Sequence, residues 1–420
     1  MRLKEQRSWL TVASGLTLGL VLAGCGSSST PSSGGSSATG GTNNNCGANH
    51  NQLCPIVVVP QVTNPEEIVK AIQGEVMSPG SIDQIVANLQ KSVPAAWSGP
   101  TDTTKIPAKP LTLALISCSA SLHGCVTPLT GAAEAAGHLG WKTTIYDGGG
   151  SPAAWNKVLL NAVASRVDAI LFTSINPLLI QQGLEAAKAA GIPVLSASSG
   201  SSDPNPTVAI PSGKVWPLLD VSQSFVDTGR QIADWIINDS GGKANVLVLT
   251  DKEYSSGVSM AGSVDELNKR CPDCVLSTFD FLGASVGTTL ANRTVDYLRT
   301  HPDISYVIAP YDPAAAAIAP AMAQASITKV KMCSLLGDQQ NLDFIRKGQV
   351  QTCDAAYDNY YTGWAMVDQL MRYLNKQKFS VPLGENTPSV LLDKSNLPPS
   401  GSDWLTSIDY KSKYLALWTK

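Results

Sequence analysis

Short apolar runs alternate with amphipathic segments along most of this chain, and residues 168–196 show the pattern most clearly. The run that begins at Asp168 is apolar and stops at Asn176-Pro177, as a strand does when it enters a turn. Apolar residues then recur at helical spacing until Gly191 and Pro193 end the helix. A second apolar run follows directly. The pattern therefore predicts a parallel strand–helix–strand unit with a right-handed crossover.

The same alternation on both sides of this unit predicts an α/β protein with two doubly wound parallel-sheet lobes. The further strands expected are 111–117, 141–146, 209–210, 244–250, 275–279, 306–309, 331–336 and 350–355. The further helices expected are 64–74, 81–91, 127–139, 152–165, 221–239, 257–269, 288–300, 312–325, 342–347 and 360–375. Residues 94–110 form an irregular connection. Because ligands of open α/β sheets bind beyond the carboxyl ends of the strands, we expect a site there.

The first residues have the organisation of a bacterial export signal. Arg2, Lys4 and Arg7 precede an apolar run over 10–22 that is too short to span a membrane comfortably. The run ends in L-A-G-Cys25, which resembles a lipobox and implies cleavage before Cys25 and acyl chains on its sulfur. An ordinary signal peptide with an incidental cysteine is the alternative. A Ser/Gly-rich stretch follows and predicts a flexible tether between an acyl anchor and the folded body.

Composition sets further bounds. The chain has 420 residues, of which 43% are hydrophobic and 15% charged, enough for a sizeable core in two or three domains. Its net charge of -3, with no basic block after the first few residues, argues against a nucleic-acid partner.

Nine cysteines are present, and apart from Cys25 they fall in close pairs. In an exported chain this predicts the disulfides Cys46–Cys54, Cys118–Cys125, Cys271–Cys274 and Cys333–Cys353. The Cys271–Cys274 pair also has the spacing of a redox or zinc half-site. However, it follows a predicted helix instead of opening one, and no second C-x-x-C accompanies it.

Several segments, in order, resemble the sugar-binding, ribose-binding-protein-like branch of type I periplasmic binding proteins, which serve ABC importers. They are Trp141–Asp147, Val167–Ile170, Ala190–Val194, Val226–Ile236, Gly337-Asp338 with Ile345–Gly348, and Tyr357-Asp358 with Gly363. The resemblance covers about 111–392 and implies two lobes that close on one ligand and dock on a permease with its ATPase. Where the family often has Asp-Asn, Arg and Asn-Asp, this chain has Ser224-Phe225, Ser259 and Tyr311-Asp312. A sugar or polyol is the expected ligand, with a nucleoside or an aromatic acid as alternatives.

The resemblance and the composition together predict the following division. Residues 1–24 are a lipoprotein signal peptide, 25–54 a tether and 55–110 a helical extension. Residues 111–217 with 338–357 form the first lobe, 218–337 with 358–392 the second, and 393–420 a C-terminal tail. Hinges are expected near 215–222, 337–338 and 357–359.

Polar and aromatic residues at the strand ends and crossings are the candidate ligand-binding residues. They are Ser119, Ser121, His123, Asp147, Asn176, Phe225, Tyr254, Tyr311, Asp312, Asp338, Gln339, Tyr357 and Asp358. Asp338 is favoured because it matches the family motif. The plainer alternatives are turn or cap roles for Asp147, Asn176 and Asp312, a surface position for His123, and core packing for Tyr254 and Tyr357.

The sequence gives little support for an enzyme. No Walker motif occurs, and Ser326–Lys329 has S-x-x-K spacing without its usual partner motif. The four histidines form no H-x-x-x-H pair, so neither a metal nor a cofactor is expected. We therefore expect a monomeric, lipid-anchored solute-binding protein on the outer face of the membrane. A ligand sensor for a signalling receptor, or an extracellular enzyme on the same scaffold, is the alternative.

Overall fold

The computed structural model describes residues 81–199, 213–251 and 257–420. The predicted helix 64–74, strand 209–210, Tyr254 and the Cys46–Cys54 disulfide lie outside these ranges.

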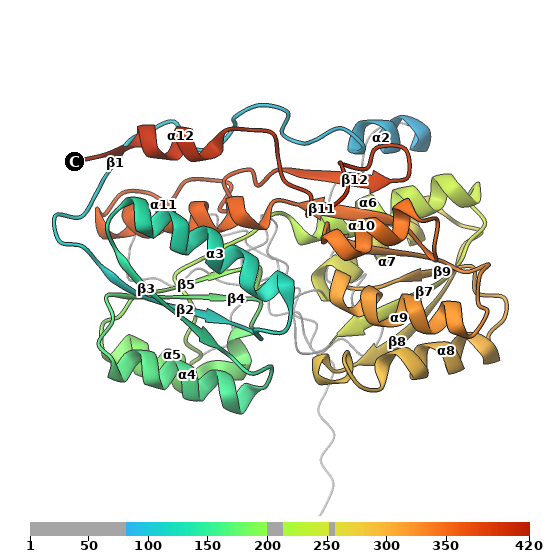
Figure 1. The fold of residues 1–420 in the computed structure, drawn as a ribbon, viewed down its shortest axis with the longest axis horizontal. Coiled ribbons are helices and arrows are strands. Elements are labelled where there is room, and N and C mark those ends of the chain that lie inside the picture. The colour runs from blue at the N-terminus through green and yellow to red at the C-terminus, as the bar shows by residue number, and fades with distance from the viewer. Residues whose placement is uncertain (1–80, 200–212, 252–256) are drawn as a thin grey trace, which may run out of the picture. The chain divides into compact units, whose positions relative to one another are not determined.

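The first lobe is built on a five-stranded parallel sheet of order β3-β2-β4-β5-β6. Its strands are β2 (Thr112–Ser117), β3 (Lys142–Asp147), β4 (Ala169–Thr173), β5 (Val194–Ala197) and β6 (Asp220–Val221). Its helices are α3 (His123–His138), α4 (Pro152–Ala164) and α5 (Gln181–Ala189), the last preceded by a 3-10 turn at Pro177–Ile180. Every residue of β4 is buried, because helices cover both faces of the sheet (Figure 1). The predicted strand–helix–strand unit is therefore confirmed.

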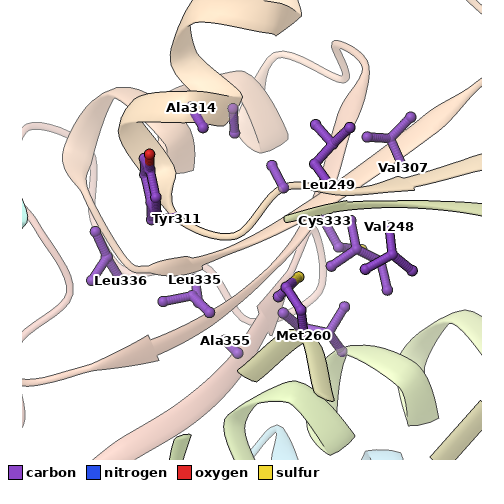
Figure 2. Packing of buried hydrophobic residues seen from close by; sticks show 14 of the residues in the cluster. Val248, Leu249, Met260, Val307, Tyr311, Ala314, Cys333, Leu335, Leu336 and Ala355 are labelled. Atoms are coloured by element: carbon purple, nitrogen blue, oxygen red, sulfur yellow. The ribbon is translucent and has the colours of Figure 1, made fainter. Parts of the chain in front are cut away.

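The second lobe is built on a six-stranded sheet of order β12-β11-β10-β9-β7-β8, in which only β12 is antiparallel to its neighbour. Its strands are β7 (Asn245–Asp251), β8 (Val275–Phe281), β9 (Tyr306–Ile308), β10 (Lys331–Leu336), β11 (Gln351–Tyr357) and β12 (Ser389–Asp393). Its helices are α6 (Phe225–Ser240), α7 (Gly257–Arg270), α8 (Leu290–Thr300), α9 (Asp312–Gln324) and α10 (Gln339–Arg346). In Figure 2, Met260 of α7 lies below Val248 and Cys333 of the sheet and beside Ala355. The predicted fold class, two α/β lobes with mainly parallel sheets, is confirmed.

The chain crosses between the lobes at places that differ from the prediction. Residues 338–357 were assigned to the first lobe, but β11 lies in the six-stranded sheet, where Cys353 is paired with and disulfide-bonded to Cys333 of β10. The following helix α11 (Asn359–Leu374) was assigned to the second lobe but packs against α3 of the first. The crossings are therefore β6 to α6, β11 to α11 and α11 to β12. The Gly337-Asp338 turn joins β10 to α10 within the second lobe and is not a crossing.

Two glycines allow α11 to lie close against α3. A Cβ atom on Gly363 would lie 2.1 Å from the carbonyl oxygen of Pro128, and one on Gly131 would lie 2.3 Å from that of Tyr360. Both neighbours are backbone atoms, so neither can move aside easily. The helix that returns from the second lobe is thus locked to the first by direct backbone contact.

The two flanking segments extend over both lobes, along the upper edge in Figure 1. Before the first sheet, α2 (Ile82–Leu89) packs against α6, Val93 pairs with Ser389, and Trp97 packs on Tyr361 and Tyr414. After β12, Trp404 packs against the second lobe, and α12 (Tyr410–Leu417) packs against α11. Finally β1 (Thr104–Lys105) pairs with β13 (Trp418–Thr419). The predicted irregular connection and C-terminal tail are therefore partly ordered into these elements.

Other differences are local. Val221 was expected to open a helix, but it pairs in β6, and α6 starts at Phe225 because the Ser224 hydroxyl caps it by accepting from Asp227 N. Three of the four predicted disulfides are joined, namely Cys118–Cys125, Cys271–Cys274 and Cys333–Cys353.

Candidate functional site

The carboxyl ends of strands from both sheets face a cleft of about 1160 Å³. Its walls come from the loop after β2 and the start of α3 in the first lobe, and from α9, α10 and the segment before α8 in the second. The side chains that give it polar character are Ser119, Ser121, His123, Asp338, Gln339, Gln340, Asn341, Asp343, Lys347 and Asp403. This position agrees with the general rule for open α/β sheets.

A smaller cavity of about 60 Å³ adjoins this cleft, and the two share Leu122 and Pro313. It is lined by the Cys118–Cys125 disulfide and by Gly124, Ser174, Ser198, Phe225, Pro310, Tyr311, Leu335, Leu336 and Tyr357. No charged side chain is among the described residues that line it. The inner cavity is therefore largely apolar, with a few hydroxyl groups at its wall.

Aromatic rings form much of the inner wall. The rings of Phe225, at the first crossing, and Tyr357, at the second, meet edge-to-face with centroids 6.5 Å apart. The Tyr311 hydroxyl donates a hydrogen bond to Asp251 Oδ2 at 2.6 Å, which turns its polar end away into the second lobe. Burial raises the pKa of the Tyr357 phenol, and the neighbouring side chains of Gln223 and Ser198 oppose that shift. These rings present apolar surfaces with neutral hydroxyls at their margins.

Two buried carboxyl groups shape the turn that carries Asp338. Asp312 accepts a hydrogen bond from Asp338 N at 2.7 Å, and Asp354 accepts one from Gly337 N at 3.0 Å. The Ser334 hydroxyl hydrogen-bonds to both. Burial, together with the neighbouring carboxylates, raises the pKa of Asp312 well above its ordinary value, and burial raises that of Asp354 to about 6. The raised pKa values mean that the pair binds a proton more readily than free carboxyl groups do, and both side chains support the turn from within the second lobe.

His123 joins the two walls of the cleft. Its Nδ1 lies 3.1 Å from Asp338 Oδ1, and its Nε2 lies 3.6 Å from Asp403 Oδ2. A hydrogen bond from Gln339 N to Asp403 Oδ1, at 2.9 Å, fixes that second carboxylate against α10. The hydrogen bond to Asp338 raises the pKa of the imidazole, although burial opposes the shift. The ligand atoms of these three side chains lie within 4.8 Å of one another.

The structure sorts the predicted site residues into three groups. Five line the wide cleft, namely Ser119, Ser121, His123, Asp338 and Gln339. Three line the inner cavity, namely Phe225, Tyr311 and Tyr357. Four line neither and have structural hydrogen bonds, namely Asp147, Asn176, Asp312 and Asp358.

The structural roles of the third group follow from these bonds. Asp147 accepts from Ala120 N at 2.8 Å and orders the loop after β2. Asn176 accepts from Leu178 N at 3.0 Å and caps the 3-10 turn. Asp358 accepts from Tyr361 N at 2.9 Å and from Thr406 N at 3.0 Å, so it caps α11 and ties down the C-terminal segment. Short polar residues at strand ends serve these roles as readily as ligand binding.

Sequence reasoning missed other residues of the site. Leu122, Leu335 and Leu336 line the inner cavity, but an apolar residue at a strand end has no signal that separates it from the core. Asp403 lies in the segment assigned as a tail, far in sequence from the other groups. Gly149 and Gly150 line the wide cleft and were visible as the glycine run after the second strand.

Over the ranges that the structure describes, no helix combines the length and apolar character needed to cross a bilayer.

Comparison with known proteins identifies a family with this architecture. The family described as "Periplasmic binding protein domain" matches residues 115–378. A search of curated protein sequences found no significant match.

Solved structures share the fold at low sequence identity. An ABC-transporter solute-binding protein from Agrobacterium vitis with bound allitol has a TM-score of 0.59 and 19% identity, over 69% of this chain and 98% of that one. A carbohydrate-transporter solute-binding protein from Agrobacterium radiobacter, in complex with D-arabinose, has a TM-score of 0.58 and 21% identity, over 74% and 99%. A solute-binding protein from Mycobacterium smegmatis with bound glycerol has a TM-score of 0.58 and 17% identity, over 71% and 100%.

Proposed function

Because this chain belongs to the periplasmic binding protein family and has its type I fold, we propose that it is an extracytoplasmic solute-binding lipoprotein. In this proposal it captures a small sugar or sugar-like molecule between its lobes and delivers it to an ABC importer. The observation that carries the proposal is the inner cavity at the strand ends of both sheets, with three aromatic rings at its wall. The protein binds and releases its ligand without chemical change.

The walls favour an uncharged ligand with one flat apolar face. The described lining offers no charged partner to an ionic group, whereas Phe225 and Tyr357 can pack against the C–H face of a sugar ring. Ser174, Ser198 and the Tyr357 hydroxyl are positioned to exchange hydrogen bonds with ligand hydroxyls. Of the compounds named for the neighbouring structures, D-arabinose can form such a ring, and allitol and glycerol are likewise uncharged.

Binding would act through lobe closure. A ligand that contacts Phe225 and Tyr357 at the crossings, Leu122 in the first lobe and Leu336 in the second stabilises the arrangement in which the lobes are together. The crossings β6 to α6, β11 to α11 and α11 to β12 are the natural hinges. A permease with its ATPase would recognise the closed, loaded form of a monomer.

The anchor is part of the proposal. Residues 1–24 would be removed, Cys25 would carry the acyl chains, and 25–54 would tether the body to the outer face of the membrane. Radiolabelled palmitate should enter the wild-type protein and not the Cys25→Ser variant. Equal labelling of the two would exclude acylation at this cysteine.

Ligand capture is tested with purified protein. Calorimetry and thermal shift against a panel of pentoses, hexoses, polyols and nucleosides should find saturable binding by an uncharged member. The Phe225→Ala variant should bind it at least about tenfold more weakly, since it loses ring packing worth about 1.5 kcal/mol. The Val275→Ala variant is the matched control, since this residue is 59% exposed and lies on β8. Unchanged affinity in Phe225→Ala, or conversion of a bound compound into a product, would contradict the proposal.

A further inference from the structure

The contact between His123, Asp338 and Asp403 joins three parts of the fold that are separate in sequence. His123 opens α3 of the first lobe, Asp338 precedes α10 of the second, and Asp403 belongs to the C-terminal segment. The contact lies in the wall of the wide cleft. Movement of the lobes apart would have to break it.

The geometry matches an imidazolium ion with two carboxylate acceptors. Asp338 faces Nδ1 and Asp403 faces Nε2, so each ring nitrogen has its own carboxylate. A neutral imidazole can donate from one nitrogen only, and the other would then present a lone pair to a carboxylate. The protonated ring satisfies both contacts as they stand.

We propose that His123, when protonated, is a latch that holds the two lobes together across the cleft, and that loss of its proton releases it. The proposal rests on the proposed closure of the lobes and adds a control on that closure. It assigns Asp403, which follows the last residue matched by the family, the role of a second anchor for the ring.

The surrounding charges support this assignment. Asp338 and Asp403 face the ring from α10 and the C-terminal segment. Behind Asp338 lie the buried carboxyls of Asp312 and Asp354. Lys347 and Asp343 line the same cleft from α10, and Glu134, Tyr360 and Lys411 line the neighbouring cleft that also reaches His123. The carboxyl groups nearest to the ring favour its charged form.

The direction of the pH effect follows from the raised pKa of His123. A histidine whose pKa is higher with the lobes together than with them apart stabilises the joined arrangement below its ordinary value of 6.5. That contribution disappears as the pH rises through the raised pKa. Because the side chain is 46% exposed, we expect the latch to change the ratio of joined to separated lobes by roughly two- to fivefold.

The test uses unliganded protein, so it does not depend on which ligand is bound. Spin labels at Lys157→Cys on α4 and Asp296→Cys on α8 report the distance between the lobes. At pH 6 the short-distance population should exceed that at pH 9 in the wild type, and His123→Gln should show the pH 9 distribution at both values. His301→Gln is the matched control, since this exposed ring stacks on Tyr297 of its own helix in the second lobe. A pH response that persists unchanged in His123→Gln would overturn the proposal.

Two further measurements distinguish a proton latch from a metal bridge and from a ring that only packs at this position. Nuclear magnetic resonance titration should give a pKa above 6.5 for His123, and the Asp403→Asn substitution should lower that pKa. If Asp403→Asn left the pKa of His123 unchanged, Asp403 would not be a second anchor for the ring. Chelation with EDTA should leave the distance distributions as they were, whereas a change on chelation would mean that a metal, and not a proton, joins the lobes. Failure of the latch with intact ligand binding in the panel above would leave the proposed function standing.

Discussion

A close approach of the lobes beside the inner cavity gives a sharp test of the proposed closure. Gly124 in the first turn of α3 faces Leu336 at the end of β10, and a Cβ on Gly124 would lie 2.8 Å from Leu336 Cδ1. The two residues belong to different lobes, so a larger side chain at 124 penalises the joined arrangement far more than either lobe alone. The conformation of Gly124 is helical and suits any L-residue.

Graded substitutions should give graded effects. With Gly124→Ala the nearest atom is the end of a flexible side chain, which can shift, so we expect little change. Gly124→Leu adds three more carbons beside a cavity of about 60 Å³, where they displace the ligand or separate the lobes. Overpacking of this kind costs about 1–3 kcal/mol, which weakens ligand affinity roughly 5- to 150-fold.

The assay combines calorimetry with the selected ligand and the spin-label distance between α4 and α8. The Gly124→Leu variant should bind weakly and show longer distances, while its melting temperature stays close to that of the wild type, because leucine suits a helix better than glycine. Tight binding with the wild-type distance would refute the reasoning, since it would mean that the lobes do not approach at this point when the ligand binds.

Three further predictions concern stability. The wild-type free energy of unfolding should fall between pH 4 and pH 7 more steeply than that of Asp354→Asn, because the Asp354 carboxyl has a pKa of about 6 in the folded protein. The difference from its ordinary value of 3.8 corresponds to about 3 kcal/mol. Urea unfolding of both proteins at the two pH values measures this difference. Gly363→Ala should lower the free energy of unfolding by about 1–3 kcal/mol, since its Cβ would meet a backbone oxygen at 2.1 Å. The control Gly137→Ala, whose Cβ would have no atom within 4 Å, should stabilise the protein slightly. Equal melting temperatures of the two variants would contradict this packing. Ending the chain after Asp409 removes Tyr414 and Trp418, which pack against Trp364, and should cost about 3 kcal/mol or more; an unchanged thermal melt would show that the C-terminal segment does not stabilise the first lobe.

Most elements of the two sheets could be predicted because buried parallel strands are continuous apolar runs. The predicted strand 331–336 agrees with β10 for this reason, and the predicted strand 350–355 ends two residues before β11 does. The sheet that each strand joins could not be predicted in the same way, because the sequence of β11 would have the same apolar pattern in either lobe. Its place follows from pairing with β10, and that of α11 from the glycine contacts with α3, both of which depend on residues distant in sequence.

The sequence predicted the position of the candidate site better than it predicted which residues line it. The rule that ligands bind beyond the carboxyl ends of the strands pointed to His123, Asp338 and the three aromatic residues. In the structure His123 and Asp338 line the wide cleft, and the aromatic residues line the inner cavity. The rule could not separate these from Asp147 and Asp358, since a carboxylate that accepts from backbone N–H groups has the same local sequence as one that accepts from a ligand. Asp403 could not be found by this rule, because it follows the last strand of the second sheet and reaches the cleft only through the path of the C-terminal segment.

The most direct test of the central claim is the distance between spin labels on α4 and α8, recorded with and without a saturating ligand identified by calorimetry. The account predicts a shorter and narrower distance distribution with the ligand bound, and the same response to be lost in Gly124→Leu. A distribution that is identical in the two states, at a ligand concentration where calorimetry shows full occupancy, would contradict capture by closure of two lobes.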